Sequence, residues 1–163
     1  MQRIDSYSIK VAISVSLCIV LFNILHREYP FYACIAAISC MKESVSSTCV
    51  AGKNRFFGTC IGALMGLIFY LFLKDTAIYC GIGIIIIVYL CRLFKHPSSI
   101  VISCIVFVAI MTNLKGVPSQ EYAIDRIINT FIGIIIAALV DKITDYILNS
   151  KIYTKSNCKS ESK

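Results

Sequence analysis

The chain has 163 residues, of which 58% are hydrophobic and only 15% are charged, and its formal net charge is +7. A soluble domain carries about 25% charged residues, and the mean hydropathy of +0.79 points away from that class as well. The composition excludes a soluble globular domain, because its long apolar runs would leave no polar surface. A lipid bilayer accepts such runs, since lipid replaces the polar exterior.

Neither the positive charge nor the cysteines indicate a nucleic-acid or metal site. The basic residues lie at the C-terminal end and between apolar runs, as in membrane proteins, and no basic helix with interleaved aromatic residues could bind nucleic acid. The nine cysteines contain no C-x-x-C pair, so we expect small buried hydrophobic side chains. G-x-S-x-G, H-E-x-x-H and Walker motifs are also missing. We therefore expect no metal, no cofactor and no enzymatic activity.

Six apolar runs separated by charged residues predict an all-α membrane protein with six transmembrane helices. We expect these helices at about 9–25, 29–47, 55–73, 76–92, 97–114 and 126–148. They form one domain, residues 1–148, followed by a Lys- and Ser-rich cytoplasmic tail at 149–163 that we expect to be disordered. Several runs are shorter than the ~20 residues that span a bilayer, and snorkelling basic side chains lengthen them. A re-entrant second helix stays open as an alternative.

The lysines and arginines predict that both termini lie in the cytoplasm, at the cell membrane. With six crossings, the outer side carries only a minority of the sixteen basic residues, namely Arg27, Lys74, Lys115 and Arg126. An excess of positive charge inside is what the positive-inside rule requires. It also supports the second crossing, because without that crossing Lys42, Lys53 and Arg55 change sides.

The third and the sixth run begin with the same pattern. Residues 55–62 read R-F-F-G-T-C-I-G and residues 126–133 read R-I-I-N-T-F-I-G, so both fit R-x-x-[GN]-T-x-I-G at an offset of 71 residues. The same offset carries the first run onto the fourth and the second onto the fifth. Because each half has three helices, the halves would be inverted in the membrane, as in many transporters. We therefore predict two inverted three-helix repeats.

Small residues recur every fourth position in both of these helices. They are Gly58, Gly62 and Gly66 in the third, and Asn129, Gly133 and Ala137 in the sixth. Residues four apart share a helix face, and small side chains let another helix approach closely in lipid. We expect these faces to pack helices together, and a narrow permeation path is the alternative.

Arg55 and Arg126 are the candidate substrate-binding residues, together with Thr59 and Thr130 one turn further along each helix. A cation at a helix N-terminus gains nothing from the helix dipole, so the arginines need another role. One role is anchoring by phosphate headgroups. The other is an anion site, in which guanidinium groups and exposed backbone N–H groups act together and the threonines donate hydroxyl groups. The sequence leaves both open.

Asp141 and Asp145 lie four residues apart at the inner end of the sixth helix, on one face. Acidic residues inside a membrane often mark ion paths, so a proton-coupling role is open. We expect instead that Asp141 lies at the interface, solvated or paired with Lys142. Lys10, at the start of the first helix, leaves the same two roles open.

The stretch 51–64, A-G-K-N-R-F-F-G-T-C-I-G-A-L, resembles the third-helix signature of the aromatic acid exporter family, the fusaric acid resistance-like proteins. The preceding A-A-I-S at 36–39 fits that signature, and residues 126–134 resemble the family's sixth helix. The resemblance covers roughly residues 7–148. It implies a six-helix membrane domain and a link to the export of aromatic carboxylic acids. Asp141 stands where relatives often have asparagine, so the resemblance gives it no role.

We therefore predict a membrane transporter that exports aromatic or other organic anions. Six short helices enclose little space, so we expect a homo-oligomer or a complex with a larger membrane partner. Many relatives carry a cytosolic domain after the sixth helix, and this chain carries only the short tail. The alternative is therefore a non-transporting membrane subunit or scaffold that assembles with a larger partner.

Overall fold

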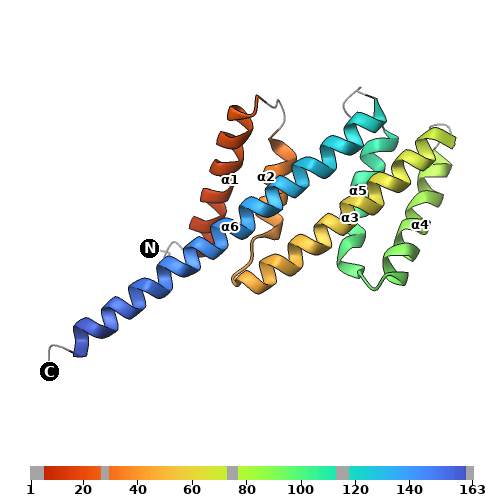
Figure 1. Ribbon diagram of the computed structural model, residues 1–163. Helices are drawn as coiled ribbons and strands as arrows, with labels where there is room; N and C mark the ends of the chain where they lie inside the picture. Colours follow the sequence, from red (N-terminus) through yellow and green to blue (C-terminus); the bar gives the residue numbers. More distant parts are fainter. Residues whose placement is uncertain (1–5, 27–29, 73–76, 113–117, 161–163) are drawn as a thin grey trace, which may run out of the picture.

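The computed structural model describes residues 6–26, 30–72, 77–112 and 118–160 (Figure 1). Within these ranges the chain forms helices and short turns and contains no strand, so the predicted all-α class is confirmed. The elements are α1 (Ser6–Ile24), α2 (Phe31–Cys40), α3 (Val45–Phe72), α4 (Ala77–Leu93), the 3-10 helix η1 (Pro97–Ser99), α5 (Ile100–Met111) and α6 (Ser119–Ser160).

The outer faces of the helices are apolar. Large apolar side chains lie exposed along all six α-helices, among them Ile13, Ile38, Leu64, Ile85, Val101 and Leu139. Soluble proteins rarely expose so much contiguous apolar surface. Three segments are long and apolar enough to cross a membrane, namely Tyr7–Ile24, Val45–Phe72 and Gln120–Tyr146, while α2, α4 and η1–α5 are apolar but shorter. These features are those of a membrane protein.

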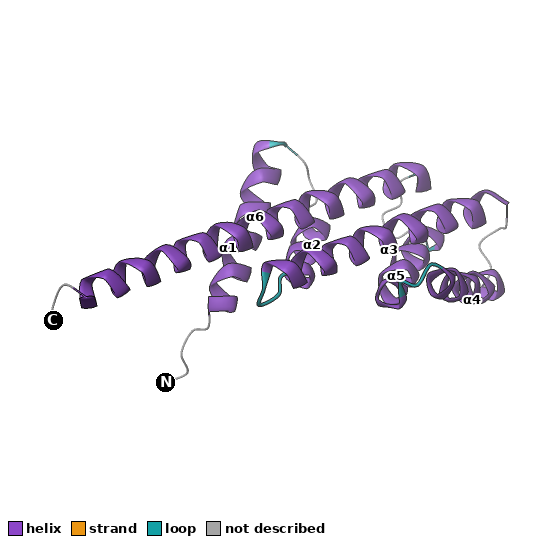
Figure 2. Ribbon diagram, turned by 60° about the horizontal axis from the view of Figure 1, so that its bottom comes forward, coloured by secondary structure: helices purple, strands orange, loops and turns teal. Residues whose placement is uncertain are grey.

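The helices of the first half run opposite to those of the second half. In Figure 1, α1 rises from the N-terminus and α2 descends, whereas α4 descends and α5 rises. The two long helices, α3 and α6, lie side by side and antiparallel, at an angle to the other four (Figures 1 and 2). As a result, the start of α1, the α2–α3 turn and the α4–α5 turn all lie at one end of the bundle.

Buried apolar side chains form three clusters, each shared by three helices. The first joins α1 and α2 to α6, the second joins α3, α5 and α6, and the third joins α4 and α5 to α3. Central members are, in that order, Phe22 and Ala137, then Ala63 and Val106, then Ile87 and Phe107. Each long helix therefore packs against the two shorter helices of the other half.

Small residues allow these long helices to approach their neighbours closely. A Cβ atom at Gly62 would lie 3.0 Å from the Val106 Cβ, and closer still to the backbone oxygen of Ser103 on α5. On α6, a Cβ atom at Gly133 would lie 2.7 Å from the Cβ of Ala36 on α2. The other small residues on these faces are Gly58 and Gly66, against α5, and Ala137, in the cluster with α1 and α2. In lipid, such close contacts favour helix association through dispersion.

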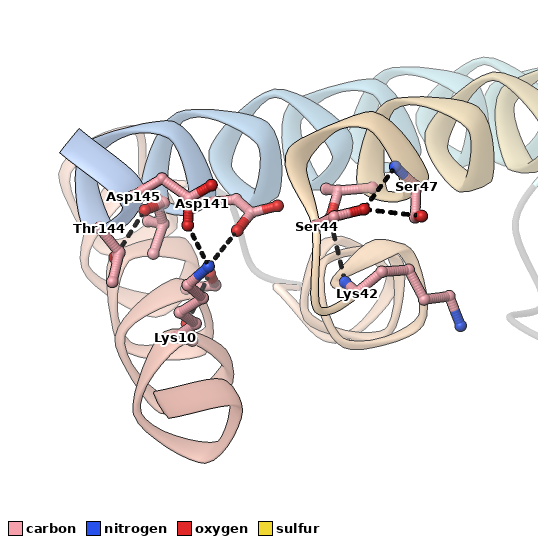
Figure 3. A network of polar contacts seen from close by, with 10 residues as sticks. Lys10, Lys42, Ser44, Ser47, Asp141, Thr144 and Asp145 are labelled. Atoms are coloured by element: carbon pink, nitrogen blue, oxygen red, sulfur yellow. Dashed lines mark hydrogen bonds and ion pairs between the residues drawn. The ribbon is translucent and has the colours of Figure 1, made fainter. Parts of the chain in front are cut away.

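The boundary between α2 and α3 differs from the predicted one. The second helix ends at residue 40 rather than 47, and the third begins at 45 rather than 55. Ser44 caps α3, because its hydroxyl accepts a hydrogen bond from the backbone N–H of Ser47 at 3.3 Å (Figure 3). The backbone N–H of Lys42 donates to the Thr48 hydroxyl at 3.0 Å and closes the turn. The serine-rich stretch therefore starts a helix instead of ending one.

The last helix is also longer than predicted. α6 begins at residue 119 rather than 126 and continues through residue 160. Residues 149–160, which we expected to be disordered, are therefore helical. No glycine or proline follows Gly133 in the sequence, so the residues that most strongly favour a helix end are missing there.

Candidate anion-binding site

The structure places Arg55 and Arg126 inside helices instead of at their ends. Arg55 is the eleventh residue of α3 and Arg126 the eighth of α6, so their backbone N–H groups belong to the helices. The expected combination of guanidinium groups with free N–H groups at a helix N-terminus is therefore wrong. Both side chains are only 7% exposed, which also disfavours simple anchoring by lipid headgroups. Two buried cations remain, at the contact of α2, α3 and α6.

Arg55 is held by a serine of α2 and keeps one unpaired donor. Its Nη1 donates to the Ser39 hydroxyl at 2.7 Å, and that hydroxyl donates in turn to the backbone oxygen of Ile35 at 2.6 Å. The Nε of Arg55 is buried and makes no hydrogen bond to a described residue. A buried donor without a partner costs about 1–3 kcal/mol. The guanidinium is therefore oriented by the protein and keeps one N–H group without a described acceptor.

An open pocket of about 520 Å³ lies beside Arg55, between the end of α2, the first turns of α3 and the start of α5. Its lining combines two cations, several hydroxyl groups and a few apolar side chains: Ser39, Lys42, Ser46, Ser47, Val50, Ala51, Asn54, Arg55, Ser98 and Ile102. Small-molecule sites have volumes of about 300–1,000 Å³. The pocket therefore has the size and the polarity for a small organic anion.

Hydrogen bonds fix the far wall of this pocket to α3. The Ser99 hydroxyl donates to the backbone oxygen of Asn54 at 2.7 Å. The Nδ1 atom of His96 lies 3.2 Å from the Asn54 Oδ1 atom, and the His96 ring packs on Phe57 with centroids 4.5 Å apart. The start of α5 is thus held against α3, and the pocket keeps its shape.

Arg126 contacts the opposite end of α2. Its guanidinium carbon lies 3.8 Å from the centroid of the Tyr32 ring, which is a cation–π geometry. The Tyr122 hydroxyl donates to the Tyr32 hydroxyl at 3.0 Å, and the two rings pack edge to face. The Nη1 of Arg126 and the Oδ1 of Asn129 are buried without a hydrogen bond to a described residue. This end of the interface therefore also has unused polar groups.

Helix α2 thus contacts both arginines. Ser39 and Tyr32 are seven residues apart, or about 10 Å along a helix. An anion bound beside α2 would be attracted by both positive charges, because opposite charges attract strongly in a buried setting. The arginines therefore mark a line along α2 that suits a negative ligand.

The two predicted threonines differ from the arginines in what they offer. The Thr59 hydroxyl donates to the backbone oxygen of Arg55 at 3.0 Å, within its own helix, so it is not free to donate to a ligand. Thr130 is 1% exposed and faces the interior from α6. Ser39 supplies the hydroxyl beside Arg55 that we expected from Thr59. The sequence contains one signal for it, since Ser39 precedes a serine-rich stretch, but no spacing links it to Arg55.

We expected Asp141 to lie at the interface, solvated or paired with Lys142. The structure contradicts both expectations. The Asp141 side chain is fully buried and accepts a hydrogen bond from the Lys10 Nζ at 2.6 Å, whereas Lys142 is exposed. Asp145 accepts from the same Nζ at 2.9 Å (Figure 3). The ion pair joins α1 to α6 at the end of the bundle that carries the α2–α3 turn.

Comparison with known proteins finds a family whose model matches most of the chain. A family model described as aromatic acid exporter family member 1 matches residues 2–143. The match includes both arginines, all of the pocket lining and most of the membrane-type helices. No curated protein and no solved structure matches the chain.

Proposed function

The chain belongs to the aromatic acid exporter family, and from this premise we propose that it exports aromatic or other organic anions across the cell membrane. One observation supports the position of the substrate site most directly. Arg55 is a buried guanidinium with an unpaired Nε, next to a pocket lined by hydroxyl groups. Family membership supports a transporter and not an enzyme, and the pocket supplies a place for the anion to bind.

The substrate carboxylate binds Arg55 in this proposal. Hydrogen bonds between charged groups are roughly twice as strong as neutral ones, and a guanidinium can donate two to one carboxylate. Lys42 adds a second positive charge at the mouth of the pocket, and Val50 and Ile102 offer an apolar wall for a ring. Ser39 keeps the guanidinium oriented. The site thus discriminates anions from neutral molecules of the same shape.

We propose that all six helices cross the membrane and that both termini are cytoplasmic. Successive helices run in alternating directions along the bundle, as six crossings require (Figure 1). The end that carries the start of α1 also carries exposed basic residues, namely Lys42, Arg92, Lys95 and Lys142. By the positive-inside rule this end is cytoplasmic. The pocket, which is lined by Lys42, Ser46 and Ser47, then lies toward the side from which an exported substrate arrives.

We also propose that the halves are inverted repeats. Gly62 of α3 and Gly133 of α6 stand 71 residues apart, and each brings its helix against the second helix of the other half. The apolar clusters repeat this arrangement, because α6 packs with α1 and α2 as α3 packs with α4 and α5. Opposite helix directions in the two halves fit the same relationship (Figure 1).

The pathway is completed between protomers of this chain. Helices α2, α4 and α5 are short for a membrane crossing, and the pocket is open on one side. A second subunit would cover the exposed apolar faces beside it and lengthen the path. In this arrangement one chain supplies the anion site and the assembly supplies the passage.

Replacing Arg55 by Ala tests the proposal in cells exposed to an aromatic carboxylate such as salicylate. Lys53→Ala is the matched control, because Lys53 is exposed two residues earlier on α3 and does not line the pocket. We expect R55A to abolish resistance at unchanged membrane abundance, and K53A to retain it. Arg55→Lys should give intermediate resistance, because an ammonium keeps the charge but loses the forked geometry. Full resistance in R55A cells would remove Arg55 from the substrate site.

A further inference from the structure

A buried group of three charged side chains joins α1 to α6 (Figure 3). The Lys10 Nζ lies 2.6 Å from the Asp141 Oδ1 and 2.9 Å from the Asp145 Oδ1. The Lys10 side chain is 4% exposed and that of Asp141 is 0% exposed, whereas that of Asp145 is 42% exposed. The inner acid is therefore sealed from solvent and the outer acid is not.

The group has one more negative charge than positive charge when all three side chains are ionised. Only one oxygen of Asp141 is paired, because its Oδ2 is buried and has no hydrogen bond to a described residue. The nearby Ser14 hydroxyl is occupied, since it donates to the backbone oxygen of Lys10 at 2.9 Å. Buried carboxylates are normally fully hydrogen-bonded, and an uncompensated buried charge is costly. An added positive charge would stabilise this arrangement.

Among the residues that the structure describes, no other ionisable side chain at this end offers a second cation to Asp141. Those on the packed elements are Tyr7 of α1, Cys40 of α2, Lys42 and Glu43 of the α2–α3 turn, and Lys142 and Tyr146 of α6. Tyr7, Lys42, Glu43 and Lys142 are exposed, and Cys40 is a buried thiol without charge. The Lys42 side chain extends away from the two carboxylates (Figure 3). Within the described residues, the unpaired oxygen of Asp141 therefore has no cation beyond Lys10.

We propose that Asp141 is a proton-binding site and that its protonation leaves Lys10 paired with Asp145 alone. A proton from water adds to the Asp141 carboxylate, and the Lys10–Asp141 ion pair is replaced by a neutral acid. Lys10 keeps its hydrogen bond to Asp145, which water can reach. The charge of the group changes from −1 to zero, and the contact between α1 and α6 shifts outward by one helical turn, from Asp141 to Asp145.

In the described part of the chain, a buried ion pair of this kind occurs at one end of the bundle and not at the other. At the 71-residue offset, Gly81 corresponds to Lys10 and Tyr70 corresponds to Asp141. A glycine and a tyrosine cannot form such an ion pair, so the equivalent contact between α4 and α3 has no counterpart of this charged group. The proton site therefore distinguishes the two ends of a fold whose halves otherwise pack alike. It does not depend on the proposed transport activity, because it concerns protonation of the resting protein.

Infrared spectroscopy of the full chain in lipid bilayers tests the proposal. A protonated buried carboxyl group gives a C=O stretching band that an ionised one lacks, and we expect such a band to appear as the pH is lowered. Asp141→Asn should abolish the band. Asp145→Asn should leave the band in place and move its midpoint to lower pH, because removal of a neighbouring negative charge favours the ionised form of Asp141. Lys10→Met should move the midpoint to higher pH, by the reverse argument.

The result that overturns the proposal is equally direct. If no carboxyl band depends on Asp141 between pH 4 and pH 9, roughly the range of perturbed carboxyl groups in proteins, then the ion pair is permanent and structural. Should D141N fail to fold, the opposite midpoint shifts in K10M and D145N still decide the question, because both variants keep Asp141. A midpoint that neither variant moves assigns the band to another acid and refutes the site.

Discussion

Replacing Gly62 by Ala tests whether close contact between α3 and α5 holds the bundle together. The added Cβ would lie 3.0 Å from the Ser103 Cα and the Val106 Cβ, and still closer to the Ser103 backbone oxygen. Backbone atoms cannot rotate away as a side chain can, so α3 and α5 must separate by several tenths of an ångström. Overpacking of this kind costs about 1–3 kcal/mol.

Gly81→Ala is the matched control for this change. Gly81 lies exposed on α4, and a Cβ there would meet no atom within 4 Å. Both substitutions gain the same intrinsic helix preference of Ala over Gly, about 1 kcal/mol, so this gain cancels in the comparison. We therefore expect Gly62→Ala to be about 1–3 kcal/mol less stable than Gly81→Ala, which is the overpacking term alone.

The free energy of unfolding can be measured for both variants by titration with a denaturing detergent, with helix content followed by circular dichroism. Gly133→Ala should be destabilised like Gly62→Ala, because its Cβ would crowd Ala36 on α2 at 2.7 Å. Equal free energies of unfolding for Gly62→Ala and Gly81→Ala would show that the close contact between α3 and α5 does not contribute to stability. The reasoning about small-residue packing would then fail for this protein.

Three further predictions concern the anion site and the topology. Ser39→Ala should weaken binding of an aromatic carboxylate, because the Arg55 guanidinium loses its 2.7 Å acceptor. The weaker binding is measured as a higher half-saturation concentration for export, and an unchanged half-saturation concentration would show that Ser39 does not orient Arg55. Tyr122→Phe should lower the free energy of unfolding by about 1 kcal/mol, because the 3.0 Å hydroxyl pair is lost; unchanged stability in detergent titration would contradict this. Single cysteines at His26 and Lys42, in an otherwise cysteine-free chain, should react with impermeant thiol reagents from opposite sides of the membrane; labelling from the same side would refute α2 as a crossing.

The sequence predicted the helical class and singled out the two arginines, because both features rest on local patterns. Charged residues between apolar runs mark helices by composition, and the shared R-x-x-[GN]-T-x-I-G pattern makes Arg55 and Arg126 equivalent. The structure brings both to one interface with α2. The helix boundaries are less predictable, because the charged Arg55 before an apolar run predicts the start of a helix at residue 55. α3 instead buries Arg55 in its third turn, where a serine of α2 pairs with it.

The contacts that depend on the tertiary fold could not be predicted. Lys10 and Asp141 are 131 residues apart, and no local pattern joins them. Lys142 looked like the partner of Asp141 because it is adjacent in sequence, but adjacent residues on a helix do not face each other. The pocket is likewise made by the ends of α2, α3 and α5 together. Its serines are ordinary in sequence and acquire a role only when the turn at Ser44 folds them beside Arg55.

The central claim is that this chain moves an organic anion by way of Arg55. Efflux of a panel of aromatic carboxylates from proteoliposomes that contain only the purified chain, with and without a pH gradient, tests it most directly. We predict saturable flux for the wild type and for Lys53→Ala, and none for Arg55→Ala reconstituted to the same density. No flux from the wild-type chain alone, together with strict co-purification of a second membrane protein from native lipid, would contradict the account and identify a non-transporting subunit.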